Sequence, residues 1–125
     1  MAVRVLLVED NEVYRSSLEL LLDLQPGLEV VGVVGSGDEA AGAAASLDAD
    51  VVLMDYRLPG IDGAAATRAV IASSGAAVLC LTAEATPDER AEVLDAGAVG
   101  LVEKGGPIDA LAHAIREAAG PIDAR

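Results

Sequence analysis

The sequence predicts an α/β fold in which five parallel strands form a doubly wound sheet and five helices cover its two faces, as a three-layer sandwich. Strand-like and helix-like segments alternate five times along the 125 residues. The strand-like segments are rich in Val and Leu and show no polar face, which is typical of parallel strands buried on both sides. They comprise Val3–Val8, Leu28–Val34, Val51–Met54, Val78–Leu81 and Leu101–Val102.

Capping and turn residues bound the five helical segments. In the fourth, Pro87 suits the first helical position, and the two acids after it favour the positive end of the helix dipole. The fifth has one apolar stripe at Ile108, Leu111 and Ile115. We expect helices from Asp10 or Asn11 to about Leu24 before Pro26–Gly27, from Ser36 or Asp38 to about Leu47, from Asp62 to about Ser73, from Thr86 to Gly97, and from Pro107 to Gly120–Pro121.

Length and composition limit the interpretation. A chain of 125 residues fits one domain, which we place at residues 1–120, with 121–125 as a tail or the start of a linker. No apolar run is long enough to cross a bilayer and the N-terminus lacks a signal peptide, so we expect a cytoplasmic protein without membrane contact. A net charge of −13 would repel a phosphate backbone, so direct nucleic-acid binding is not expected. The single cysteine, Cys80, lies within a strand and is assigned to packing.

Polar residues stand at the ends of four predicted strands: Glu9 and Asp10, then Asp55, Thr82 and Lys104. Because open parallel sheets bind ligands at the carboxyl ends of their strands, we expect three carboxylates, one hydroxyl and one ammonium to converge there. Any one of these residues could be a helix cap or a solvated side chain, but a fitting group at every one of these ends favours a site. Clustered carboxylates without His or Cys favour a hard cation such as Mg²⁺.

The chemistry that such a cluster supports is phosphoryl transfer. A carboxylate such as Asp55 can attack phosphorus and form an acyl phosphate, provided that charge on the transferred group is neutralised. Mg²⁺ and the ammonium of Lys104 would supply that neutralisation, and the hydroxyl of Thr82 could donate to a phosphoryl oxygen. We therefore predict that Asp55, Thr82 and Lys104 carry the reaction.

Four segments contain these residues: Val5–Asn11, Val51–Gly63, Leu81–Ala83 and Gly97–Lys104. Together they resemble the receiver (CheY-like) domain of bacterial two-component response regulators, and the resemblance extends over essentially the whole chain. It implies that Asp55 accepts a phosphoryl group from a sensor histidine kinase and that the domain catalyses only its own phosphorylation and dephosphorylation. It further implies that Thr82 and Lys104 sense the phosphorylated state, and that Mg²⁺ is held by Glu9, Asp10, Asp55 and the main-chain carbonyl of Arg57.

The segments Val30–Val34 and Met54–Gly63 are most similar to regulators with a LuxR-type helix-turn-helix output, which implies control of transcription. The implied partners are the kinase, a second copy of the chain in a homodimer, and a C-terminal DNA-binding domain outside this chain.

Two positions depart from the family's pattern. Leu101 replaces the usual Tyr or Phe, so we expect the conformational switch to be damped, to depend on the fourth helix alone, or to be absent. Gly105 replaces the proline that commonly follows the lysine, so we expect a trans peptide bond there.

Other interpretations compete with a phosphorylated switch. The chain could be a pseudo-receiver that binds a partner without phosphate control, or a metal-dependent phosphatase acting on free substrates. A phosphatase of the haloacid dehalogenase type would need a second acid where Arg57 stands. The segment Gly35–Ala40 fits a relaxed dinucleotide-binding pattern, but Asp38 and Glu39 would repel a pyrophosphate. His113 lies off the apolar stripe of its helix and is expected on the surface.

Two further hypotheses concern contacts. The apolar residues of the first helix cover an arc of about 200°, wider than the roughly 100° that a core-facing helix needs. We expect the surplus, toward Leu18 and Leu22, to contact a partner, so that replacing both by Glu would abolish association without unfolding the chain. Arg57 and Glu84 each follow a site residue by two positions, and they either pair across the phosphoryl group or are both solvated.

Overall fold

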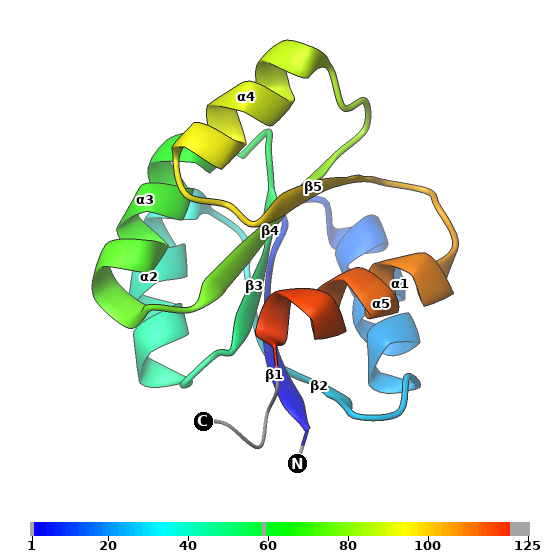
Figure 1. The fold of residues 1–125 in the computed structure, drawn as a ribbon. Coiled ribbons are helices and arrows are strands. Elements are labelled where there is room, and N and C mark those ends of the chain that lie inside the picture. The colour runs from blue at the N-terminus through cyan, green and yellow to red at the C-terminus, as the bar shows by residue number, and fades with distance from the viewer. Residues whose placement is uncertain (1, 59, 121–125) are drawn as a thin grey trace.

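The computed structural model of the protein describes residues 2–58 and 60–120. Within these ranges, five strands and five helices alternate along the chain, and all the strand pairings are parallel (Figure 1). The strand order β2-β1-β3-β4-β5 confirms the predicted doubly wound sandwich. The elements are β1 (Val3–Val8), α1 (Glu12–Asp23), β2 (Leu28–Val34), α2 (Gly37–Ser46), β3 (Val51–Asp55), α3 (Gly63–Ser74), β4 (Ala77–Thr82), α4 (Pro87–Asp95), β5 (Gly100–Glu103) and α5 (Ile108–Ala119).

The helices cover both faces of the sheet, α1 and α5 on one side and α2, α3 and α4 on the other (Figure 1). Side chains along each strand therefore alternate between two cores. In β1, Val5 and Leu7 pack with α1 and α5, whereas Leu6 and Val8 pack with α2 and α3. Because both sets are buried, the strands appear in the sequence as continuous apolar runs, without the polar alternation of a half-exposed sheet.

Three of the predicted helix caps are made by side chains. The acceptors are Asn11 Oδ1 for the Tyr14 N–H, Asp62 Oδ1 for the Ala65 N–H, and Thr86 Oγ1 for the Glu89 N–H. Of the two caps considered for α1, Asn11 makes the bond. At the start of α2, the Ser36 hydroxyl donates to Glu39 Oε2 at 3.0 Å and makes no cap bond to the backbone.

The face that α1 turns to the core is not the one expected. Leu18 and Leu22 are both buried in the core between α1, α5 and the sheet. The most exposed apolar side chains lie at the other edge of the arc, and are Val13, Leu20 and Leu24, at 79, 64 and 70% exposure. The hypothesis that Leu18 and Leu22 contact a partner is therefore wrong, because a helical periodicity gives the width of an apolar arc but not which edge meets the sheet.

The structure confirms the predictions made for Cys80, His113 and the peptide bond before Gly105. Cys80 is fully buried in β4, and the side chain of His113 is exposed, as predicted. No cis peptide bond occurs among the described residues, so Lys104 and Gly105 are joined by a trans bond. The last helix ends at Ala119 with Gly120 as its cap residue, as predicted. The place of Pro59 in its turn, the role of Pro121 after the helix and the tail at 121–125 lie outside the described residues. No helix in the described ranges is both long enough and apolar enough to traverse a bilayer.

Candidate functional site

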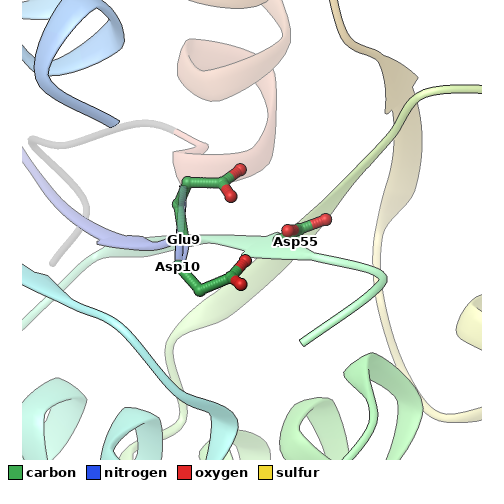
Figure 2. A group of neighbouring side chains, drawn as sticks. All are labelled: Glu9, Asp10 and Asp55. Atoms are coloured by element: carbon green, nitrogen blue, oxygen red, sulfur yellow. The ribbon is translucent and has the colours of Figure 1, made fainter. Parts of the chain in front are cut away.

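Three carboxylates meet at the carboxyl ends of β1 and β3 (Figure 2). Val8 pairs with Met54 across these neighbouring strands, so Glu9 and Asp10 emerge beside Asp55, the last residue of β3. One oxygen of each carboxylate lies within 4.8 Å of an oxygen of the other two. Glu9 and Asp55 are buried and Asp10 is exposed, so the cluster has a protein side and a solvent side.

Lys104 brings a positive charge to this cluster. Its backbone N–H donates to the Thr82 carbonyl at 2.7 Å, which holds the residue after β5 at the end of β4. Its Nζ lies 2.8 Å from Glu9 Oε1 and 3.3 Å from Asp55 Oδ1. The same ammonium lies 4.8 Å from the ring centroid of Tyr14, a cation–π contact with the first turn of α1. Nothing in the sequence pattern had marked Tyr14 as part of the site.

The two buried carboxyls differ in how readily they ionise. Burial and the neighbouring charge of Glu9 raise the pKa of Asp55 to about 6, against the opposing effects of Lys104 and the Arg57 N–H. Burial also acts to raise the pKa of Glu9, but hydrogen bonds from Lys104 and the Asn11 N–H outweigh it, so this pKa is lowered. Burial acts to lower the pKa of Lys104, yet its contacts with Glu9 and Asp55 raise it. Glu9 and Lys104 thus form the closer of the two ion pairs, and the charge on Asp55 is the less well compensated.

The donor set fits a hard divalent cation. Its side-chain ligands are all carboxylate oxygens, and burial together with repulsion from Glu9 raises the pKa of Asp55, a cost that a bound cation would offset. Mg²⁺ suits a site with few carboxylates and a solvent side, because this ion keeps several of its waters. The Arg57 N–H donates to Asp55 Oδ1 at 3.2 Å, so the chain after β3 turns beside the cluster.

Thr82 ends β4 at the same edge of the sheet, but its hydroxyl is bonded elsewhere. Thr82 Oγ1 lies 3.0 Å from Glu89 Oε1 on α4 and 3.1 Å from the main-chain oxygen of Glu84. Arg57 donates through Nη2 to the other oxygen of Glu89, at 3.1 Å. The structure therefore brings Glu9, Asp10, Asp55 and Lys104 together, and places the Thr82 hydroxyl against α4.

The pairing considered between Arg57 and Glu84 is not formed. Arg57 pairs instead with Glu89, while the exposed Glu84 contacts Thr82 through its main chain. From the sequence, Glu89 was assigned only to the helix dipole. The pattern Thr-x-x-Glu at Thr86–Glu89 was an available signal, but it predicts that the glutamate accepts from the backbone N–H of Thr86 and makes no bond with Thr82.

The segment Gly35–Ala40 includes a close contact between the start of α2 and a neighbouring loop. A Cβ on Gly37 would lie 2.8 Å from the main-chain oxygen of Ile61. The first turn of α2 therefore packs directly against the loop between β3 and α3. This packing, together with the two acids at the start of the helix, argues against dinucleotide binding there.

Comparison with known sequences assigns the family. The sequence model of the response regulator receiver domain matches residues 5–116. Over 115 residues the chain is 36% identical to the transcriptional regulatory protein LiaR of Bacillus subtilis and 36% identical to the response regulator UvrY of Escherichia coli. These matches cover 91% of this chain but 54% and 53% of the two proteins. The chain thus spans about half the length of the curated relatives it matches.

Solved structures share the fold. The signal receiver domain of the putative response regulator NarL from Mycobacterium tuberculosis matches with a TM-score of 0.89 at 30% identity, over 94% of this chain and 96% of that one. The response regulator domain of CheB from Thermotoga maritima matches with a TM-score of 0.88 at 28% identity, over 97% of this chain and 100% of that one. By its family match, its relatives and its fold, the chain belongs to the response regulator receiver domains.

Proposed function

We propose that this receiver domain accepts a phosphoryl group on Asp55 from a sensor histidine kinase, in a Mg²⁺-dependent reaction, and switches conformation to control an output. The observation that carries the proposal is the position of the Lys104 ammonium, 2.8 Å from Glu9 and 3.3 Å from Asp55. One cation thus contacts both buried carboxylates at the sheet edge where Asp10 joins them. Family membership supports a histidine kinase as the phosphoryl donor.

Asp55 is the nucleophile in the proposed reaction. One of its carboxylate oxygens forms a bond to phosphorus, the bond from phosphorus to the imidazole nitrogen of the donor breaks, and its electron pair stays on the imidazole. Lys104 already contacts Asp55 Oδ1, so its ammonium is placed to offset part of the negative charge on the phosphoryl group. The Arg57 N–H donates to the same oxygen and helps to fix the orientation of the carboxylate.

The residues that would hold Mg²⁺ are Glu9, Asp10, Asp55 and the main-chain carbonyl of Arg57. When bound, the ion supplies charge neutralisation at the phosphoryl oxygens. Glu9 is oriented by the Lys104 ammonium and by the Asn11 N–H, which donates to its Oε2 at 3.0 Å. Thr82, at the end of β4, would donate its hydroxyl to a phosphoryl oxygen in the phosphorylated state.

A labelling experiment tests the phosphoacceptor assignment. Incubation with Mg²⁺ and acetyl phosphate should add one phosphoryl group to the protein by intact-mass spectrometry, and Asp55→Asn should abolish the addition. Asp62→Asn is a matched control, because Asp62 caps the next helix and an asparagine can make the same cap. It should be labelled like the wild type. Failure of the wild type to be labelled by acetyl phosphate or by any of a panel of histidine kinases would contradict the proposal.

We further propose that the domain acts in the cytoplasm and controls transcription through a DNA-binding domain outside this chain, as a homodimer when phosphorylated. The support is the relationship to LiaR, a transcriptional regulatory protein of which this chain covers about half. Light scattering of the domain with and without Mg²⁺ and beryllofluoride, a phosphoryl mimic, tests the dimer. An unchanged monomer mass at high protein concentration in both states would argue against dimerisation of this domain.

The second candidate function is a pseudo-receiver that binds a partner without phosphate control. The observation that favours it is Leu101, which is buried in the core beside α4 and has neither a ring nor a hydroxyl to rearrange. Amide resonances around Thr82 and Leu101 separate the candidates. A switching domain shifts them when beryllofluoride binds, whereas a pseudo-receiver leaves them unchanged. A phosphatase acting on free substrates would instead turn over a generic phosphate ester.

A further inference from the structure

We infer that Glu89, on the first turn of α4, is a positioning residue that holds the Thr82 hydroxyl in the unphosphorylated domain and so sets how readily the domain switches. The inference rests on the proposed function, because it requires that the Thr82 hydroxyl serve a phosphoryl group at Asp55. Glu89 itself does not touch the reacting atoms, and it acts through Thr82.

Both carboxylate oxygens of Glu89 are engaged at the site. Oε1 accepts from the Thr82 hydroxyl at 3.0 Å, and Oε2 accepts from Arg57 Nη2 at 3.1 Å. The side chain is only 11% exposed, so water competes little for these bonds. Hydrogen bonds to an ionised acceptor are shorter and stronger than neutral ones. A carboxylate is therefore a stronger acceptor for the Thr82 hydrogen than its other partner, the main-chain oxygen of Glu84.

The fold of α4 aims this carboxylate at Thr82. Thr86 caps the helix through Oγ1, which accepts from the Glu89 N–H at 3.2 Å. In a complete capping box the glutamate side chain would return to the N-cap backbone. Here the carboxylate reaches across to β4 and to the loop after β3. Glu89 thus joins Thr82 to Arg57, and the Arg57 N–H in turn contacts the phosphoacceptor Asp55.

The proposed switch and this contact compete for one hydrogen atom. A threonine hydroxyl has a single hydrogen, so it cannot serve Glu89 and a phosphoryl oxygen together. Phosphorylation must therefore break the bond from Thr82 to Glu89, and Arg57 remains to neutralise the carboxylate. The hydrogen bond from Thr82 to Glu89 stabilises the unswitched conformation, and the bond from Thr82 to the phosphoryl group stabilises the switched one. The difference in strength between these two bonds biases the equilibrium between the two conformations. With Leu101 already buried, the contact of Thr82 with α4 is a direct link by which the phosphoryl site can act on that helix.

Glu89→Gln tests the inference without changing the size of the side chain. The amide has one oxygen and one NH2 group in place of the two carboxylate oxygens, so its two ends cannot accept from Thr82 and from Arg57 separately, as those of Glu89 do. In protein free of phosphodonor, NMR couplings should show the Thr82 side chain redistributed among its rotamers. In the presence of Mg²⁺, the half-saturating beryllofluoride concentration should fall roughly threefold to tenfold, as expected for the loss of one competing hydrogen bond.

Glu92→Gln is the matched control. It removes the same charge from the same helix, but the Glu92 carboxylate accepts from the Tyr56 hydroxyl at 2.9 Å and makes no hydrogen bond with Thr82. Both readouts should stay at wild-type values in this variant. An equal fall in the beryllofluoride midpoint for Glu92→Gln and Glu89→Gln would mean that charge alone is responsible, and would overturn the inference.

The outcomes separate this inference from the proposed function. If the wild type fails to bind beryllofluoride, the proposed function fails, and the Thr82 rotamers still report whether Glu89 holds the hydroxyl. If the wild type binds it and Glu89→Gln changes neither the rotamers nor the midpoint, Glu89 is not a positioning residue. Should Glu89→Gln not fold, Glu89→Asp gives the same two measurements with a carboxylate too short to reach both partners.

Discussion

The Lys104 ammonium lies 2.8 Å from Glu9 Oε1, so the residue after the last strand neutralises the buried carboxylate at the end of the first. The two residues are 95 positions apart in the sequence. They meet because β1 and β5 both end at the same edge of the sheet, with β3 and β4 between them. Because Lys104 lies closer to Glu9, the charge on Asp55 is the less well neutralised one, and a bound metal ion would stabilise it most.

Lys104→Met should destabilise the metal-free domain, because it leaves the buried Glu9 carboxylate without its cation. We expect the free energy of unfolding to fall by about 1–3 kcal/mol. Mg²⁺ should recover part of the loss. Urea unfolding with and without Mg²⁺ measures both effects. Arg68→Met removes an exposed cation from α3 and is the control, so an equal loss in both variants would assign the effect to net charge.

Asp55→Asn should stabilise the metal-free domain at neutral pH. The pKa of Asp55 is about 6 in the folded protein and ordinarily 3.8, so between these values the native state binds more protons than the unfolded state. The contribution of Asp55 to the free energy of unfolding therefore falls as pH rises from about 4 to about 6, and it stays at this lower value at higher pH. We expect the variant to exceed the wild type by about 1–3 kcal/mol at pH 7.5. The gap should close near pH 4, and a pH-independent gap in urea unfolding would exclude this cause.

Leu18→Glu and Leu20→Glu should have opposite outcomes, although the two residues share one helix. Leu18 is buried against the sheet, so a charge there should cost at least about 3 kcal/mol and unfold much of the protein. Leu20 is 64% exposed, and its replacement should change stability by less than about 0.5 kcal/mol. Thermal unfolding followed by circular dichroism measures both. A tolerated Leu18→Glu would contradict the orientation of α1.

Cys80 should be inert toward thiol reagents in the folded domain. Burial raises the pKa of its thiol to about 11, even though a contact with Thr67 opposes this, so little thiolate exists at pH 8 and reagents have no access. Reaction with a disulfide reagent should be slow in buffer and fast in urea. Rapid modification of the native protein would show that β4 opens easily at its centre.

Much of the fold was predictable because the patterns that mark its strands and helix ends each lie within a short stretch of sequence. Apolar runs buried on both faces mark the strands, and residues such as Asp62 and Thr86 cap the helices that the sequence placed after them. The carboxylate cluster was also predictable, because a parallel sheet brings the carboxyl ends of its strands to one edge. Strand-end position alone was therefore enough to place Asp55 beside Glu9 and Lys104.

Only the tertiary structure decided which of two residues is buried or bonded when the local sequence pattern does not distinguish them. Leu18 and Leu20 carry the same apolar signal, and only the packing of α1 against the sheet and α5 determines that the first is buried and the second exposed. Glu84 and Glu89 are equally able to bond Arg57, yet the turn of α4 directs the second one inward to Arg57 and Thr82. Sequence periodicity fixes which residues share a face, whereas burial and hydrogen-bond partners depend on the neighbouring elements that close over that face.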